Sequence, residues 1–371
     1  MESRLSIWAL GLLFFTLVVA DGNNSNSTSN GSRNCKFAAI FNFGDSHSDT
    51  GSSSATFNFL QAPNGMSFRN YSKRSSDGRL IIDYIAENLG LPYLDAPVDS
   101  IGTNFKHGAN FATGGARISS DVIMGKTTPY HLGVQVSQFL QFKSRAIALH
   151  KELLNNKNNP PIENKFPEPE VFSKALYTID IGGNDDFNNL TISTTMDQFT
   201  NTLQRLLGNG AKYFWIHNTG PNGCGPFGHI NCKKEPGCVL DQNGCDKKWD
   251  ENSQAYNKLL KDRVSRLRAQ YPDAVITYVD IYSAKHKLIV NAKKYGFGDP
   301  FKFCCGNGYS CGQVDFNETL LGTACKDPQN YINWDGIHYT QAANRFVANF
   351  VVNGSLSDPP VPVAEACHKQ Y

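Results

Sequence analysis

Short apolar segments that alternate with longer helical patterns constrain the fold of this chain more than any other feature. Each segment is rich in β-branched or aromatic side chains, which suit a buried strand. The segments lie at residues 37–43, 176–181, 211–217 and 274–280. Apolar residues at helical spacing fall at 80–89, 134–154, 196–207, 249–271 and 341–352. Strands that alternate with helices predict an α/β fold with a mainly parallel sheet between helix layers.

The first of these strands runs into a turn that could expose a nucleophile. Its sequence continues as Gly44-Asp45-Ser46, and small polar residues follow. Open α/β sheets place their ligands at the carboxyl ends of strands, so Ser46 is the candidate nucleophile. Taken alone, however, a Gly-Asp-Ser sequence is typical of an ordinary turn.

Near the other end of the chain, Asp335 and His338 stand three residues apart. A serine hydroxyl needs a base that takes its proton, and the base needs an acceptor that orients it. One turn could present both side chains to the same point, although a helix N-cap followed by a surface histidine has the same spacing. Glycine-rich segments at 108–115 and 181–185 could add backbone N–H groups and a side-chain amide that stabilise an oxyanion.

These segments, taken together and in order, resemble the GDSL esterase/lipases of the SGNH hydrolase superfamily, and most closely the secreted plant branch. The four matching blocks are 44–51, 108–115, 182–185 and 335–338, and further landmarks of the plant branch stand at 76–83, 217–221 and 304–306. The resemblance covers about residues 36–350. The chain departs from the family name at His47, which replaces a leucine that is variable in the plant branch and not catalytic.

The resemblance implies a three-layer α/β/α sandwich, the flavodoxin-like SGNH hydrolase fold, and a two-step acyl transfer. In that mechanism His338 deprotonates Ser46, Asp335 orients the imidazole, and water releases the acid from an acyl-enzyme. Matching the family's blocks places the oxyanion hole at the N–H of Ser46, the N–H of Gly115 and the side-chain amide of Asn184. We expect no cofactor and no metal.

Several neighbouring residues keep alternative interpretations. Gly114 competes with the next glycine as an oxyanion donor. Asp49 is expected to cap the helix that follows it. His47 and His217 are candidates for substrate contact, although a turn residue and a strand-end residue are the simpler interpretations. The carboxylates at 185–186 indicate a metal only weakly, since no further acidic ligand is positioned by the sequence.

Charge and composition restrict the compartment and the partners. The net charge of +2 gives no field that would favour nucleic acid or a membrane surface. Residues 1–20 carry Arg4 and then an apolar run that ends in a small residue, which is typical of a signal peptide. That run is too short to span a bilayer, so we expect no stable membrane anchor. The predicted location is extracellular, in the cell wall or in the vacuole.

Ten cysteines fit an exported chain, because an even number in such a chain indicates disulfides. The connectivity does not follow from the sequence; we expect local bridges within 224–245 and within 304–325, and a bridge from Cys35 to Cys367. Zinc is a weaker alternative, because the spacing lacks a pair of Cys-x-x-Cys knuckles. Glycosylation sequons stand at Asn23, Asn26, Asn30, Asn70, Asn189, Asn317 and Asn353.

The expected organisation is a signal peptide at 1–20, a disordered tail at 21–34, one hydrolase domain at 35–352 and a C-terminal tail at 353–371. The tail is expected to wrap the surface or to fray. The segment 222–248 is too poor in apolar residues to bury a core, so disulfides are expected to hold it. It would line the substrate cleft if it lies over the carboxyl edge of the sheet.

The predicted function is hydrolysis of carboxylic esters that are small molecules or are borne on polysaccharides. Short-chain acyl or acetyl esters are favoured, because no large amphipathic lid is evident between the blocks. Two alternatives remain. The first is an acyltransferase that uses the same triad with an alcohol acceptor, and the second is a catalytically idle binding or defence protein. Glycoside hydrolysis ranks last, because no pair of catalytic carboxylates is identifiable. The sequence leaves the oligomeric state open.

Overall fold

The computed structural model describes residues 34–68, 73–99, 101, 103–121, 128–155, 164–185, 192–306 and 310–369. The predicted signal peptide and almost all of the predicted N-terminal tail lie outside these residues. The sequons at Asn23, Asn26, Asn30, Asn70 and Asn189 also lie outside them. Asn317 and Asn353 are described, and both are exposed, as a glycosylated asparagine must be.

A mainly parallel sheet forms the centre of the described domain. Its strands stand in the order β2-β1-β3-β4-β5-β6, and only β6 is antiparallel to its neighbour. β1, β3 and β5 are buried along their whole length, as expected for a parallel sheet covered on both faces. The strands are Ile40–Gly44 (β1), Gly108–Asn110 (β2), Leu176–Asp180 (β3), Tyr213–His217 (β4), Val275–Val279 (β5) and Ser357–Asp358 (β6).

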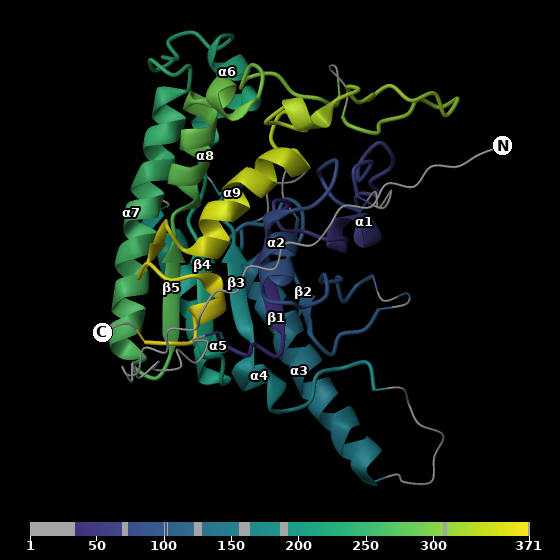
Figure 1. The fold of residues 1–371 in the computed structure, drawn as a ribbon, viewed down its shortest axis with the longest axis vertical. Helices are drawn as coiled ribbons and strands as arrows, with labels where there is room; N and C mark the ends of the chain where they lie inside the picture. Colours follow the sequence, from purple (N-terminus) through teal and green to yellow (C-terminus); the bar gives the residue numbers. More distant parts are fainter. Residues whose placement is uncertain are drawn as a thin grey trace, which may run out of the picture. The chain divides into compact units, whose positions relative to one another are not determined.

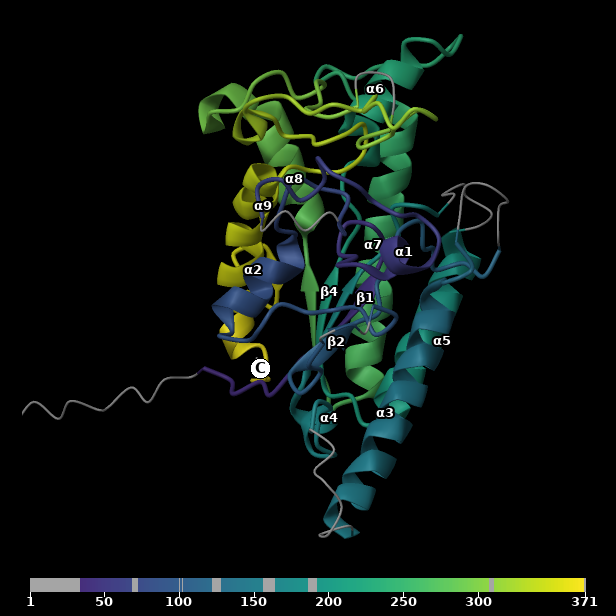
Figure 2. The ribbon, with the colours of Figure 1, turned by 90° about the vertical axis from the view of Figure 1, so that its right-hand side faces the viewer.

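Helices cover both faces of this sheet, which Figure 2 shows nearly edge-on. On one face α2 packs on α9 and α9 on α8; on the other face α3 packs on α5 and α5 on α7 (Figures 1 and 2). The main helices are α2 (Ile81–Asn88), α3 (Leu132–Asn155), α5 (Ile192–Gly208), α7 (Lys247–Gln270), α8 (Ile281–Val290) and α9 (Gln341–Asn353). Shorter helices are α1 (Ser52–Thr56), α4 (Val171–Lys174) and α6 (Pro226–Cys232), with single 3₁₀ turns at Asn222–Cys224, Ala292–Tyr295, Pro328–Asn330 and Val363–Glu365. The predicted three-layer α/β/α sandwich is confirmed.

Alternation along β1 divides the core between the two faces. Phe41 and Phe43 point to the α3 side, where the Phe41 ring stacks on Phe172 and both phenylalanines meet Phe139 edge-on. Ile40 points to the other side, among the side chains of α2 and α9. Because successive strand residues face opposite sides of the sheet, the five residues of β1 contribute side chains to both cores. This packing fixes where the strand ends along the sheet.

The predicted strands and long helices all form, with ends that shift by at most a few residues. Two strands and one long helix were not predicted. β2 consists of Gly-Ala-Asn, which has no strand propensity, and it forms because its backbone pairs with Ile40 on β1. α8 follows β5 directly, with Asp280 as its N-cap accepting from the N–H of Ser283.

Five disulfides account for all ten cysteines, and the expected arrangement is confirmed. Two bridges lie within the first cysteine cluster and two within the second, and one joins the ends of the domain. The pairs are Cys224–Cys245, Cys232–Cys238, Cys304–Cys325, Cys305–Cys311 and Cys35–Cys367. Because these sulfurs are oxidised to disulfides, they cannot act as the thiolate ligands of a zinc site.

The C-terminal tail packs on the domain through Cys367. Ser357 and Asp358 pair with β5, and the side chains of Val361 and Val363 are buried beside α9. The tail therefore wraps the domain instead of fraying. Within the described residues, no helix is both long and apolar enough to cross a membrane.

Candidate active site

The turn that carries Ser46 is built where β1 leaves the sheet. The N–H of Asp45 donates to the carbonyl of Asp180 at the end of the neighbouring β3, 3.1 Å away. A side chain at Gly44 would lie 2.3 Å from that same carbonyl, so only glycine allows this approach. The turn then presents Ser46 at the carboxyl edge of the sheet, as the sequence predicts.

The structure brings Ser46, His338 and Asp335 together in one hydrogen-bonded chain. The Nε2 of His338 lies 2.8 Å from the Oγ of Ser46, and its Nδ1 lies 2.7 Å from the Oδ2 of Asp335. Ser46 and His338 are 292 residues apart in the sequence. The surface-histidine alternative for His338 therefore does not describe its position.

The acid and the imidazole shift each other's pKa. Burial alone would raise the pKa of Asp335, but the charge of His338 and hydrogen bonds from its ring and from two backbone N–H groups hold that pKa below its usual value. Burial alone would lower the pKa of His338, yet Asp335, and more weakly Asp45, raise it above 6.5. The carboxylate therefore stays ionised, and its charge favours the protonated form of the His338 imidazole.

The loop that carries Asp335 and His338 has little regular secondary structure of its own. Two disulfides staple the strand-like segment beside it, in which the N–H of Cys304 donates to Asn333 and that of Cys305 to Trp334. The buried indole of Trp334 donates to the side chain of Asn64 at 2.9 Å. A small cystine–tryptophan core therefore fixes the position of Asp335 and His338.

The glycine block is tied to the nucleophile segment through Asp49. This buried carboxylate caps the first turn of α1 by accepting from the N–H groups of Ser52 and Ser53, which confirms the expected role. It also accepts from the N–H of Gly114 at 2.8 Å. The N–H of Gly114 is therefore already used in a structural hydrogen bond. In the described part of the chain, the N–H of Gly115 has no acceptor, which favours this glycine as the oxyanion donor.

Asn184, in the segment after β3, lies beside the glycine block. Its amide donates to the carbonyl of Ala116 at 3.0 Å, and no described residue accepts its second amide hydrogen, which could therefore serve a ligand. The next residue, Asp185, accepts from the N–H groups of Ile118 and Ser119. These three bonds fasten the Asn184 turn to the glycine block. Asp186 lies outside the described residues.

Two cavities adjoin the triad. The smaller has a volume of about 210 Å³ and includes His47, Asn184 and Ile337 in its lining. The wider one, of about 840 Å³, is bounded by Asp335 and His338 themselves and by exposed apolar residues such as Phe59. The smaller cavity is lined by His47, Gly183, Asn184, Gly220, Pro221, Asn222, Gly225, Phe227, Trp249, Lys285, Gly336, Ile337 and Tyr339. The segment 222–248 thus contributes to this cavity, as expected if it covered the carboxyl edge.

The two candidate histidines have different surroundings. The Nδ1 of His47 lies 3.1 Å from Asp45, and its ring faces the small cavity, tilted against His338. His217 is buried under the site, with Nδ1 3.3 Å from Asp180, and it is not among the residues that line either cavity. The structure therefore keeps His47 as a candidate for substrate contact and gives His217 a place in the protein interior.

The sequence did not reveal Lys285, a buried lysine that lines the small cavity. Its burial lowers its pKa, which Asp180 and Asp45 partly oppose. The pKa of Asp180 falls to about 2, because the imidazole of His217, 3.3 Å away, and the charge of Lys285 outweigh its burial. No sequence signal could have found this lysine, because a lysine in a helical segment is usually exposed.

Among the described residues, the groups that could offer three metal ligands are all built on disulfide cysteines. They lie at Cys35 with Cys367 and at Cys232 with Cys238, and a sulfur in a disulfide is a poor ligand.

Comparisons with known proteins agree with this architecture. The family model described as GDSL-like Lipase/Acylhydrolase matches residues 40–351. A GDSL esterase/lipase of Arabidopsis thaliana is 46% identical over an alignment of 353 positions, which covers 91% of this chain and 92% of the relative. A protein named Esterase from Hevea brasiliensis is 41% identical, with 91% of each chain covered. Alpha-L-fucosidase 3 of Arabidopsis thaliana is 39% identical, with 98% of each covered.

The fold and the comparisons place the protein among the SGNH-type α/β hydrolases. Within them, the chain belongs to the GDSL-like lipase/acylhydrolase family. This confirms the family resemblance and the predicted class of enzyme, the carboxylic ester hydrolases.

Proposed function

We propose that this protein is an exported serine esterase that cleaves short-chain acyl esters through an acyl-enzyme. The observation that supports this most directly is the continuous hydrogen-bonded chain from Ser46 through His338 to Asp335. A base within hydrogen-bond reach of a hydroxyl, itself oriented by a carboxylate, is the arrangement that activates a serine.

In the first step, the Nε2 of His338 accepts the hydroxyl proton while the Oγ of Ser46 attacks the ester carbonyl. Asp335 holds the proton on Nδ1 and stabilises the imidazolium. The imidazolium then donates its proton to the leaving alcohol, and the acyl group stays on the serine. Water, deprotonated by the same imidazole, releases the acid in the second step.

The negative charge on the carbonyl oxygen needs donors that are in place before the reaction. We assign this role to the N–H groups of Ser46 and Gly115 and to the amide of Asn184. Two of these donors are backbone groups in turns fixed by hydrogen bonds, so they need little reorganisation as charge develops. Gly114 is excluded from this set because Asp49 already occupies its N–H.

The small cavity supports a short acyl group. Its volume of about 210 Å³ lies below the ~300–1,000 Å³ that is usual for drug-sized ligands. Phe227 and Trp249, which meet edge-on at 5.9 Å between ring centroids, give it an apolar wall. An acetyl or butyryl group fits such a volume, and a bulky alcohol, including a polysaccharide, can extend into the wider cavity beside His338.

Export is part of the proposal. Five disulfides support folding in an oxidising compartment. The predicted signal peptide and sequons agree with this, and detection of the glycosylated protein in the culture medium of expressing plant cells tests it.

The test of the chemistry compares the full chain, produced by a secretory route, with Ser46→Ala and Ser48→Ala variants. Ser48 is the matched control, because it is a buried serine of the same motif. Hydrolysis of p-nitrophenyl acetate and butyrate is expected to vanish only in Ser46→Ala, and long-chain esters are expected to react slowly even in the wild type. Equal hydrolysis by folded wild type and Ser46→Ala would contradict the proposal.

The same preparation separates the alternatives. If added alcohols receive the acyl group faster than water does, the protein is an acyltransferase. Release of p-nitrophenol from a fucoside that persists in Ser46→Ala would indicate glycoside chemistry independent of the serine. A protein that is folded but inactive in all assays would favour a binding role.

A further inference from the structure

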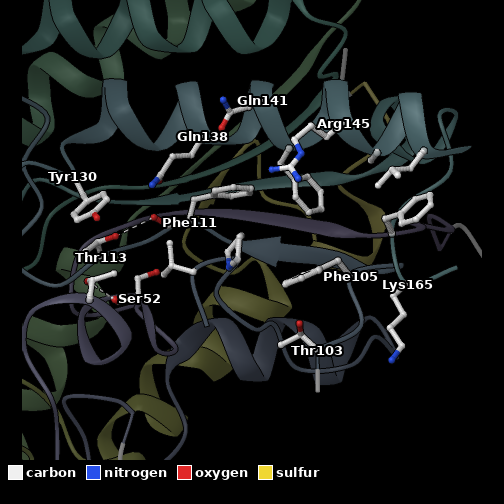
Figure 3. Close-up of a pocket in the computed structure, with 17 residues that line it drawn as sticks. Ser52, Thr103, Phe105, Phe111, Thr113, Tyr130, Gln138, Gln141, Arg145 and Lys165 are labelled. Atoms are coloured by element: carbon white, nitrogen blue, oxygen red, sulfur yellow. Dashed lines mark hydrogen bonds between the residues drawn. The ribbon is translucent and has the colours of Figure 1, made fainter. Parts of the chain in front are cut away.

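A third cavity lies away from the triad, between α3 and the segments that flank the edge strand β2. It has a volume of about 550 Å³, and none of the described residues that line it borders the two cavities beside Ser46 and His338. Figure 3 shows its lining side chains. They are Ser52, Thr56, Pro97, Val98, Thr103, Phe105, Phe111, Thr113, Tyr130, Gln138, Gln141, Phe142, Arg145, Ala146, Leu149, Lys165 and Phe166.

Aromatic rings form the inner wall of this cavity. Phe142 of α3 meets Phe105 and Phe111 edge-on, with ring centroids 5.7 Å and 5.9 Å apart. Phe111 is buried, and the half-buried rings of Phe105 and Tyr130 leave apolar surface open to the cavity. A volume of this size with an apolar wall is typical of a site that encloses a small molecule.

Among the described residues that line the cavity, the polar groups are positive or neutral. Of these 17 residues, Arg145 and Lys165 are cations, and none is Asp or Glu. Arg145 extends from α3 toward the aromatic rings, and the amide of Gln138 points into the cavity from the same helix (Figure 3). Among the described residues, no carboxylate forms an ion pair with Arg145.

We propose that this cavity is a second ligand site, separate from the catalytic cleft, and that it binds an amphipathic carboxylate. The apolar body of the ligand, an alkyl chain or a ring, lies against Phe105, Phe111 and Phe142. Its carboxylate pairs with Arg145 at the rim, where the planar guanidinium matches a carboxylate with two hydrogen bonds. An amine would be repelled by the lining cations, and a neutral alcohol would leave the arginine without a partner.

The site does not depend on the proposed mechanism, so binding is the property to measure. Dansylated undecanoic acid serves as the fluorescent probe, and dodecanoate and dodecanol serve as competitors that differ in the charge of the head group. The variants are Arg145→Gln, which removes the charge, and Gln138→Trp, which fills the cavity. Lys151→Gln is the matched control, because Lys151 is an exposed cation of α3 that does not line the cavity.

Wild type is expected to bind the probe saturably, with displacement by dodecanoate at lower concentration than by dodecanol. Arg145→Gln is expected to weaken dodecanoate binding about fivefold and to leave dodecanol unchanged, as for loss of a charge-assisted contact. Gln138→Trp is expected to abolish binding of all three compounds, and Lys151→Gln to change nothing. An unchanged circular dichroism spectrum and melting temperature check that each variant is folded.

Three results would overturn the proposal. The first is that wild type does not bind the probe. The second is that Arg145→Gln and Lys151→Gln have the same effect on dodecanoate, which would mean that the charge at the rim is not used. The third is loss of probe binding in Ile337→Trp, which fills the cavities beside the triad and would place the probe in the catalytic cleft.

Discussion

The two halves of the candidate active site are held in place by different physical means. Ser46 stands at the end of a buried strand, in a turn that hydrogen-bonds directly to the neighbouring strand. Asp335 and His338 stand on a loop with little regular structure, fixed by cystines and the buried Trp334. The sheet half derives its rigidity from backbone pairing and the main core, whereas the loop half depends on covalent links.

This difference shows that a site can be assembled from a rigid edge and a stapled loop. A loop has few buried apolar contacts, so without cross-links it would be among the first parts of a domain to open. The Cys304–Cys325 bridge spans 21 residues and restrains the unfolded loop. Variants in each half show whether the two halves act as one unit and whether they lose function separately.

The largest expected effect concerns the joint action of Ser46 in one half and His338 in the other. Ser46→Ala and His338→Ala should each lower kcat by roughly 10⁴–10⁶, because neither group activates the reaction without the other. The double variant should be no slower than either single variant. Pre-steady-state and steady-state hydrolysis of p-nitrophenyl acetate measures this. Additive losses would mean that the two residues act in separate steps.

The next effect concerns the oxyanion donor in the sheet half. Asn184→Ala should reduce kcat by roughly 10²–10³ with little change in KM, because the amide binds charge that develops only in the transition state. Asn222→Ala is the control, since Asn222 lines the same cavity and is not assigned to the oxyanion. An equal loss of kcat in the two variants would contradict the assignment of Asn184 to the oxyanion hole.

Removal of a disulfide should destabilise the loop that carries Asp335 and His338 before it affects the sheet. By loop entropy, a Cys304→Ser/Cys325→Ser variant should lose about 3 kcal/mol of unfolding free energy, and a Cys232→Ser/Cys238→Ser variant, with a separation of only 6, about 2 kcal/mol. The first variant should also lose hydrolysis at temperatures where circular dichroism still reports an intact sheet. Parallel melting and activity curves decide this; coincident loss would show that the loop half does not open on its own.

The smallest expected effect links the halves electrostatically. Because Asp335 and Asp45 raise the pKa of His338, the neutral base is lost as the pH falls, and the acid limb of kcat/KM should lie above 6.5. Asp45→Asn removes one of these charges, so the limb should move to lower pH by less than about one unit. Lys285→Met should move it the opposite way, since the charge of Lys285 lowers that pKa. If the acid limb of the pH profile stays at the same pH in both variants, the charges of Asp45 and Lys285 do not influence the pKa of His338.

Much of this molecule follows from its sequence because the relevant signals are local. Apolar runs gave the principal strands, helical spacing gave the long helices, and Gly44-Asp45-Ser46 marked the turn after β1. β2 could not be predicted, because three residues without strand propensity become a strand only when Ile40 offers its backbone. The choice between Gly114 and Gly115 also depended on a distant acceptor, Asp49.

The sequence by itself determined the α/β layers and singled out Ser46, Asp335 and His338 as candidates, because periodicity and ordered motifs are written in neighbouring residues. Only the tertiary structure decided the rest. It brought Ser46 to 2.8 Å from a histidine 292 residues away, buried Lys285 beside the cleft, and opened an arginine-rimmed cavity along α3. Distances, burial and cavities arise from packing between segments that are remote in the chain, and no local pattern encodes them.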